Sequence, residues 1–163
     1  MSDLPQELQY TLEHEIPLTQ HLGLRVISYD ENGLTLSAPL APNINHKRTA
    51  FAGSLNAVVT LTGWGLLWLI LQELEIPARV VIQDSSCNYL RPVKDDFSAF
   101  CRKPTPQQIS RMASMLKKRG RARIELSVEV RNETTAAVAF TGRYVLMLIE
   151  ERAQDAEATS RGF

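Results

Sequence analysis

Cysteine and histidine are scarce in this chain, and those present are poorly spaced for metal binding. Its 163 residues contain two cysteines, Cys87 and Cys101, and three histidines, at positions 14, 21 and 46. No Cys-x-x-Cys pair occurs, so neither a metal site nor a disulfide framework is expected. Two free thiols fit a reducing compartment, and we therefore expect a cytoplasmic protein.

The chain also lacks an excess of charge of either sign. Eighteen Lys and Arg residues balance eighteen Asp and Glu residues, so the formal net charge is zero. A neutral chain has no overall attraction for nucleic acid or for an anionic membrane, so neither is expected as a partner. The first five residues, Met-Ser-Asp-Leu-Pro, are polar and acidic, unlike a signal peptide.

One long segment has no charge at all. Between Thr49 and Gln72 there is no ionisable side chain, and residues 55–71 are strongly apolar. That length is sufficient to span a bilayer. Polar residues such as Ser54 and Asn56 interrupt the segment, however, and its carboxyl end is flanked by acidic residues rather than basic ones. We therefore favour a buried core helix, from about residue 53 to about residue 74, over a membrane span.

The residues before this helix predict a helix and a hairpin. Leucines at helical spacing predict an amphipathic helix over residues 4–20, which Pro17 ends or kinks. Alternating residues at 22–29 and 34–38 flank Asn32-Gly33, a dipeptide typical of hairpin turns. Residues 39–52 are expected to form an irregular loop.

The residues after the central helix predict four strands and one short helix. Strands are expected at 79–90, 97–102, 121–131 and 135–149, where apolar residues alternate or form continuous runs. The last strand is apolar on both faces, so we expect it at a central or interface position. Thr105 and Gln108 have the spacing of a capping box, and Gly120 suits a helix end, so a helix is predicted from about 105 to 118.

These elements define an α+β fold. About six antiparallel strands would curl around one long central helix, with residues 1–150 forming a single domain. Residues 151–163 are polar and are predicted to be a disordered tail.

Several segments resemble the hotdog-fold thioesterases, and more narrowly the YiiD C-terminal-domain type. The matching pieces are Asn45-His46, Thr49-Ala-Phe51, Gly53-Ser-Leu55, Gly63-Trp-Gly65, residues 88–93 and residues 119–123. Their order and spacing, rather than any single motif, carry the resemblance. It implies a hotdog fold, acyl-thioester hydrolysis without a metal or bound cofactor, and assembly into a homodimer or a higher oligomer.

The resemblance places the chemistry at the start of the central helix. The first amides of a helix have no internal partners and lie at its positive end, so they can polarise a thioester carbonyl. Gly53 allows close approach to the backbone, and Ser54 adds a hydroxyl group. The alternative is that the two residues only form a tight loop and a cap.

A general base is missing from its usual place. Related enzymes often carry a carboxylate on the central helix at the position of Thr60, which cannot act as a base at neutral pH. The His-Gly-Gly signature is also replaced, by Phe51-Ala-Gly53. Two residues are candidates for the missing base: Asp84, acting across a dimer interface, and His46. Asn45 is a candidate to act between the base and the water. Asp84 also fits a role as a charge that protects an edge strand, and His46 also fits a surface role.

Other residues are candidates for substrate binding. Thr49 and Phe51 belong to the matching loop, and Asn56, Thr60 and Trp64 share the helix with the proposed carbonyl site. Core packing is the alternative role for Trp64. The basic run that contains Arg119 and Arg121 suits the phosphates of coenzyme A or of a carrier-protein arm. It equally suits the carboxyl end of a helix, where cations are favoured.

Two functions remain open from the sequence. One is an acyl-CoA or acyl-carrier thioesterase. The other is a non-catalytic module that binds acyl thioesters or has a regulatory role, and the absent helix carboxylate favours this second function. A purely structural dimerisation domain is a third and weaker interpretation.

Overall fold

A six-stranded antiparallel sheet wraps one long helix in the computed structural model, which describes residues 3–150. The predicted tail, residues 151–163, lies outside the described residues. The helices are α1 (Leu4–Glu15), α2 (Leu18–Leu22), the 3-10 turn η1 (Ala41–Asn43), α3 (Ala52–Glu73) and α4 (Pro106–Arg119). The strands are β1 (Arg25–Tyr29), β2 (Gly33–Ala38), β3 (Ala78–Tyr89), β4 (Phe97–Arg102), β5 (Arg121–Asn132) and β6 (Thr135–Leu148).

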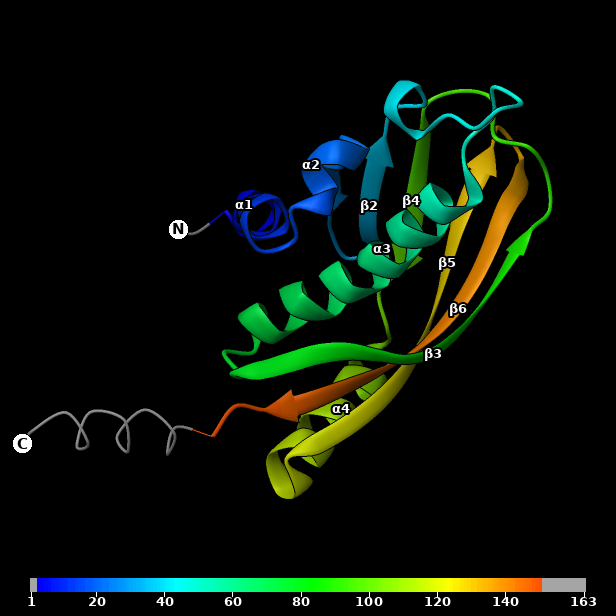
Figure 1. Ribbon diagram of the computed structural model, residues 1–163. Coiled ribbons are helices and arrows are strands. Elements are labelled where there is room, and N and C mark those ends of the chain that lie inside the picture. The colour runs from blue at the N-terminus through cyan, green and yellow to red at the C-terminus, as the bar shows by residue number, and fades with distance from the viewer. Residues whose placement is uncertain (1–2, 151–163) are drawn as a thin grey trace, which may run out of the picture.

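The strand order leaves β1 and β3 at the two edges of the sheet. The order is β1-β2-β4-β5-β6-β3, with every neighbouring pair antiparallel. Figure 1 shows the sheet curving around α3, with α1 and α2 beside β2 and α4 near the start of β5. The predicted α+β fold is confirmed, as is the central position of β6 between β5 and β3.

The central helix is buried because apolar side chains occur around most of its circumference. Twelve of its residues are buried, including Leu66, Leu67 and Leu69, which are fully enclosed. α3 is long and apolar enough to cross a membrane, and core helices of soluble proteins meet the same criteria. In this structure the curved sheet and α1 supply the apolar surroundings of the helix.

The predicted helix over residues 4–20 is two helices. α1 ends at Glu15, and Pro17 precedes the short α2, which Gly23 ends with a φ of 68°. The Thr19 hydroxyl donates a 2.7 Å hydrogen bond to the carbonyl of Leu12, which fastens α2 against the end of α1. The first strand therefore begins at Arg25, three residues later than its alternation predicts.

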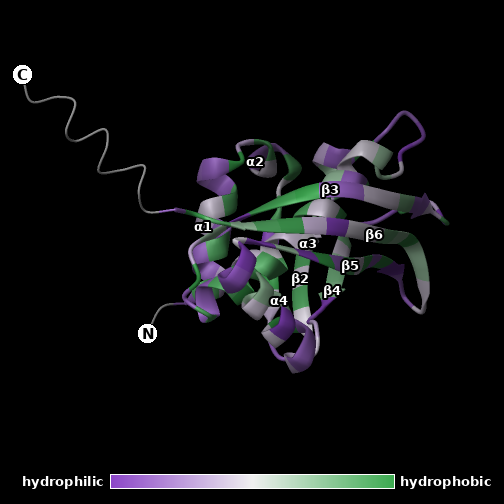
Figure 2. Ribbon diagram, turned by 90° about the horizontal axis from the view of Figure 1, so that it is seen from below, coloured by the Kyte–Doolittle hydropathy of each residue, from purple (hydrophilic) through white to green (hydrophobic). Residues whose placement is uncertain are grey.

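The predicted capping of α4 is present. Thr105 Oγ1 accepts from the Gln108 amide at 3.2 Å, and the Gln108 side chain accepts from the Thr105 amide at 2.8 Å. Gly120 ends the helix with a φ of 71°. In Figure 2, α4 shows both hydrophilic and hydrophobic colours, as expected of a helix with one face on the protein and one in solvent.

Candidate active site

The amino end of α3 begins without a side-chain cap. Phe51, the residue before the helix, is extended, with φ −65° and ψ 132°, and its side chain accepts no hydrogen bond. The first helical hydrogen bond runs from the Leu55 amide to the Phe51 carbonyl at 3.0 Å. The amides of Gly53 and Ser54 precede that bond, and within residues 3–150 neither has an acceptor. Two backbone donors are therefore available at the positive end of the helix dipole.

This end of the helix is open rather than sealed inside the protein. Phe51 is 55% exposed and Gly53 is also exposed, whereas Ser54 is only 9% exposed. A groove of about 330 Å³ lies beside it, between the loop before α3 and the end of β3. The lining of the groove includes Asn45, Thr49, Ala52, Leu55 and Tyr89. An acyl carbonyl can thus approach the first turn from solvent.

The loop before α3 is held in place by Asn45. Its side-chain oxygen accepts from the amides of Lys47 and Thr49 at 2.9 and 3.1 Å, and its side-chain NH₂ donates to Thr49 Oγ1 at 3.0 Å. These bonds use the side-chain amide of Asn45 within the loop. Asn45 and Thr49 therefore hold the loop that forms one wall of the groove. His46 is exposed in the same loop.

A polar group at the end of β3 faces the start of α3, at a position that the sequence motifs did not single out. The Tyr89 hydroxyl donates to the carbonyl of Ala52 at 3.3 Å. Burial, with a contribution from hydrogen bonding to Cys87, raises the pKa of Tyr89, and a hydrogen bond with the Asn56 side chain partly offsets this. Tyr89 is therefore a neutral phenol at pH 7. The signal available in the sequence was the two-residue spacing of Cys87 and Tyr89, which puts them on one face of a strand.

The partly buried stripe of α3 continues from this point. Asn56, Thr60 and Trp64 lie at successive turns, and all three are half-buried. Thr60 Oγ1 donates to Asn56 Oδ1 at 3.4 Å, and Trp64 Nε1 donates to the carbonyl of Val80 in β3 at 3.0 Å. The structure therefore brings Asn56 to the open end of the helix, while Trp64 fastens the helix to the edge strand.

Asp84 lies on the other side of the sheet. It stands opposite Arg143 in β6, and its carboxylate is 3.4 Å from the Arg143 guanidinium. The next residue of β6, Tyr144, points to α3, so Arg143 and Asp84 face away from α3. Within one protomer Asp84 is thus separated from Gly53 and Ser54 by the sheet itself.

Arg119 and Arg121 lie far from the start of α3. Arg121 is opposite Met147 in β6, whereas Tyr89 is opposite Val138, nine residues away. Nine strand residues span about 30 Å. The two arginines instead line a separate groove between α4 and β5. Within one protomer, the structure does not bring them together with the candidate carbonyl site.

A helix wrapped by a six-stranded antiparallel sheet, with its amino end open, is the arrangement of a hotdog fold. A protein from Chlorobaculum tepidum with unknown function is 32% identical, with a TM-score of 0.87 over 90% of this chain and 95% of its own. A putative thioesterase from Shewanella oneidensis is 33% identical, with a TM-score of 0.81 over 91% of this chain and 100% of its own.

The chain belongs to the family described as Putative thioesterase (yiiD_Cterm), whose model matches residues 5–148. The resemblance inferred from the sequence motifs is therefore confirmed. A further structure of the same fold is PA5026 from Pseudomonas aeruginosa, a protein of unknown function. It is 21% identical, with a TM-score of 0.77 over 88% of this chain and 95% of its own.

Proposed function

We propose that this protein hydrolyses acyl thioesters, with acyl-CoA or an acylated carrier protein as substrate. The observation that carries the proposal is the open, uncapped start of α3, where the Gly53 and Ser54 amides have no acceptor within residues 3–150. A thioester carbonyl in the adjoining groove would accept from these donors. The oxyanion that forms when water attacks would then be stabilised; one such donor typically contributes about 10²–10³ in rate.

The neighbouring side chains support orientation rather than proton transfer. Asn56 and Tyr89 border the start of α3 and are both neutral, so they can hold the attacking water or the substrate by hydrogen bonds. Among the described residues, 3–150, no carboxylate lines the 330 Å³ groove. We therefore expect slow turnover, because general base catalysis is typically worth about 10²–10⁴ in rate.

A non-catalytic acyl-thioester binding module is the second candidate. The specific observation in its favour is Thr60, a half-buried hydroxyl at the position where related enzymes often carry the catalytic carboxylate. Such a module would use the same amides and groove to hold an acyl thioester without cleaving it.

The proposal includes a homodimer formed through β3. This edge strand has exposed apolar side chains, Val81 at 44% and Ile82 at 37%. A long edge strand with apolar side chains invites pairing with another strand. Pairing with a second copy would cover this edge and would add the partner's surface to the groove beside α3. The two free thiols support a cytoplasmic location for this assembly.

The experiment is a hydrolysis assay over a panel of acyl-CoA chain lengths, paired with calorimetric binding of a non-hydrolysable thioether analogue. Gly53→Val, whose side chain would collide with the Phe51 ring at the start of α3, should abolish both signals. Ser54→Ala tests the hydroxyl, and Ser110→Ala, an exposed serine on α4, is its matched control. Turnover supports the enzyme, and analogue binding that Gly53→Val removes, without turnover, supports the binding module. Absence of both would refute the proposal.

A further inference from the structure

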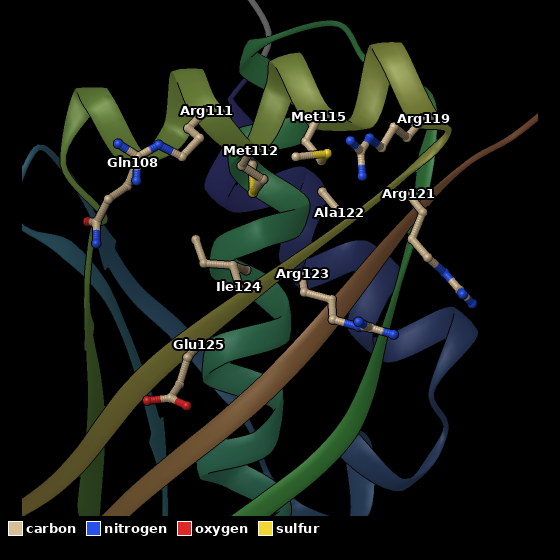
Figure 3. A pocket seen from close by; sticks show the side chains of 10 residues that line it. All are labelled: Gln108, Arg111, Met112, Met115, Arg119, Arg121, Ala122, Arg123, Ile124 and Glu125. Atoms are coloured by element: carbon tan, nitrogen blue, oxygen red, sulfur yellow. The ribbon is translucent and has the colours of Figure 1, made fainter.

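A second groove lies away from the candidate active site, between α4 and the first half of β5. It has a volume of about 800 Å³. Figure 3 shows its two walls: α4 with Arg111, Met115 and Arg119, and β5 with Arg121 and Arg123. Because α4 and β5 are joined at Gly120, the groove is closed at that end, and the walls separate toward Gln108 and Glu125.

The groove exists because this half of β5 lacks a neighbouring strand on one side. β4 pairs with β5 only at Val128–Val130, whereas β6 pairs with β5 along its whole length. Residues 121–127 therefore present a free edge toward α4. The helix covers this edge with Met112 and Leu116, which are buried.

The rim of the groove is strongly basic, and its arginines form no ion pair within residues 3–150. Four arginines line it, at positions 111, 119, 121 and 123, together with one carboxylate, Glu125, at the open end. All four ion pairs found within residues 3–150 lie elsewhere, so none of these arginines has a carboxylate partner there. Like charges held at one groove repel one another, and an anionic ligand would relieve that repulsion.

The floor of the groove is apolar. It contains Met112, Met115, Ala122 and Ile124, and Met115 is 39% exposed. Methionine side chains adapt their shape and are common at surfaces that accept apolar partners. The groove therefore combines a basic rim with an apolar floor.

We propose that this groove docks an acidic amphipathic α-helix of a partner protein. Arg111 and Arg119 are eight residues apart on α4, which places them about 12 Å apart along the helix axis. Charge spread over that length matches acidic residues on successive turns better than it matches one compact phosphate cluster. The apolar floor would take the leucine or valine side chains of the same helix.

A nucleotide fits the groove less well. In the described part of the chain, no aromatic ring on which a base could stack lines the groove, although Gln108 and Glu125 offer hydrogen bonds at the open end. Helix docking is independent of thioester hydrolysis, because the groove and the start of α3 lie at opposite ends of the sheet in one protomer.

The test measures binding of a fluorescent 18-residue peptide with Glu on one helical face and Leu on the other. A peptide of the same composition in scrambled order keeps the charge and loses the apolar face. We expect the full-length protein to bind the ordered peptide at least fivefold more tightly than the scrambled one. Arg119→Glu/Arg123→Glu should weaken binding by about tenfold or more, and added salt should weaken it further.

Lys117→Glu is the matched control. It reverses a charge on α4 on the side of the helix away from the groove, and should change affinity less than twofold. Arg119→Ala/Arg123→Ala is a second variant, for the case that the charge-reversed one misfolds. Its folding is checked by circular dichroism, and it should also weaken peptide binding. Three results would overturn the proposal. The protein could bind both peptides equally well, or Lys117→Glu could weaken binding as much as the double variant does. The third is that coenzyme A binds in a way that depends on these arginines while the peptide does not bind.

Discussion

The Tyr144 hydroxyl of β6 donates a 2.7 Å hydrogen bond to the carbonyl of Thr60 in the middle of α3. Tyr144 is completely buried. Its ring lies against Gly63, where an added Cβ would come within 2.7 Å of Tyr144 Cζ. The pair therefore fixes the position of the central helix along the sheet, and with it the place of the helix start.

Changes at either residue of this contact should destabilise the fold. Tyr144→Phe leaves the Thr60 carbonyl without the hydroxyl and should lower the free energy of unfolding by about 1–2 kcal/mol. Gly63→Ala forces the methyl group against the Tyr144 ring and should cost about 1–3 kcal/mol. Urea denaturation monitored by tryptophan fluorescence measures both. If Gly63→Ala lowers the free energy of unfolding in the wild-type protein but not in the Tyr144→Leu variant, the clash with the Tyr144 ring is the cause.

Restoring the missing carboxylate should increase activity. Thr60→Asp places a base one turn after Asn56 on the half-buried stripe of α3. We expect kcat for acyl-CoA hydrolysis to rise by about 10- to 100-fold. Gln72→Glu, which adds the same charge near the other end of α3, is the control and should leave kcat unchanged. An unchanged rate in a folded Thr60→Asp variant would mean that this turn does not face the scissile bond.

The two thiols should differ in reactivity. Cys101 is completely buried, while Cys87 is half-buried at the end of β3. Ellman's reagent at pH 8 should therefore modify one thiol per native chain and two per chain in denaturant. Cys87→Ser should abolish the native signal. Modification of Cys101 in the native Cys87→Ser protein would show that β4 opens readily.

Stability should fall in alkaline solution. Burial raises the pKa of the Cys101 thiol to about 12, from an ordinary value of 9.0. Between these values the unfolded chain loses the proton while the folded chain keeps it, so the free energy of unfolding decreases as pH rises from about 9 to about 12. Burial also raises the pKa of Tyr144, which acts in the same direction. Thermal unfolding from pH 8 to pH 11 measures the slope, and Cys101→Ala should make it shallower.

Assembly should depend on one edge of the sheet. Val81 on β3 and Ile27 on β1 are both exposed apolar residues on edge strands, at 44% and 59%. If the dimer forms through β3, Val81→Glu should yield a monomer by light scattering, whereas Ile27→Glu should not. Dissociation by Ile27→Glu alone would move the interface to β1.

The local signals in the sequence were sufficient for most of the architecture. The capping box at Thr105, the alternation of β5 and the apolar run of α3 each determine an element from neighbouring residues, and all three are present. Pro17 allowed either an end or a kink. The position of the short α2 is fixed by tertiary bonds, from Thr19 to the carbonyl of Leu12 and from Gln20 to the carbonyl of Glu13.

The site was less predictable because it depends on contacts across the sheet. A register shift between Ile82 and Asp84 changes which face the following residues occupy. Ile82 stands opposite Tyr144 on the α3 side, and Asp84 stands opposite Arg143 on the other side. Periodicity alone does not reveal such a bulge, so the sequence could not place Asp84.

The start of α3 has a thermodynamic consequence. A helix that begins without a cap gives up about 1 kcal/mol that a Ser, Thr or Asp at Phe51 would supply. A bound acyl oxygen would supply the missing acceptors, so occupancy and folding stability are linked. The melting temperature of the protein should then rank candidate acyl compounds by affinity, even where none is turned over.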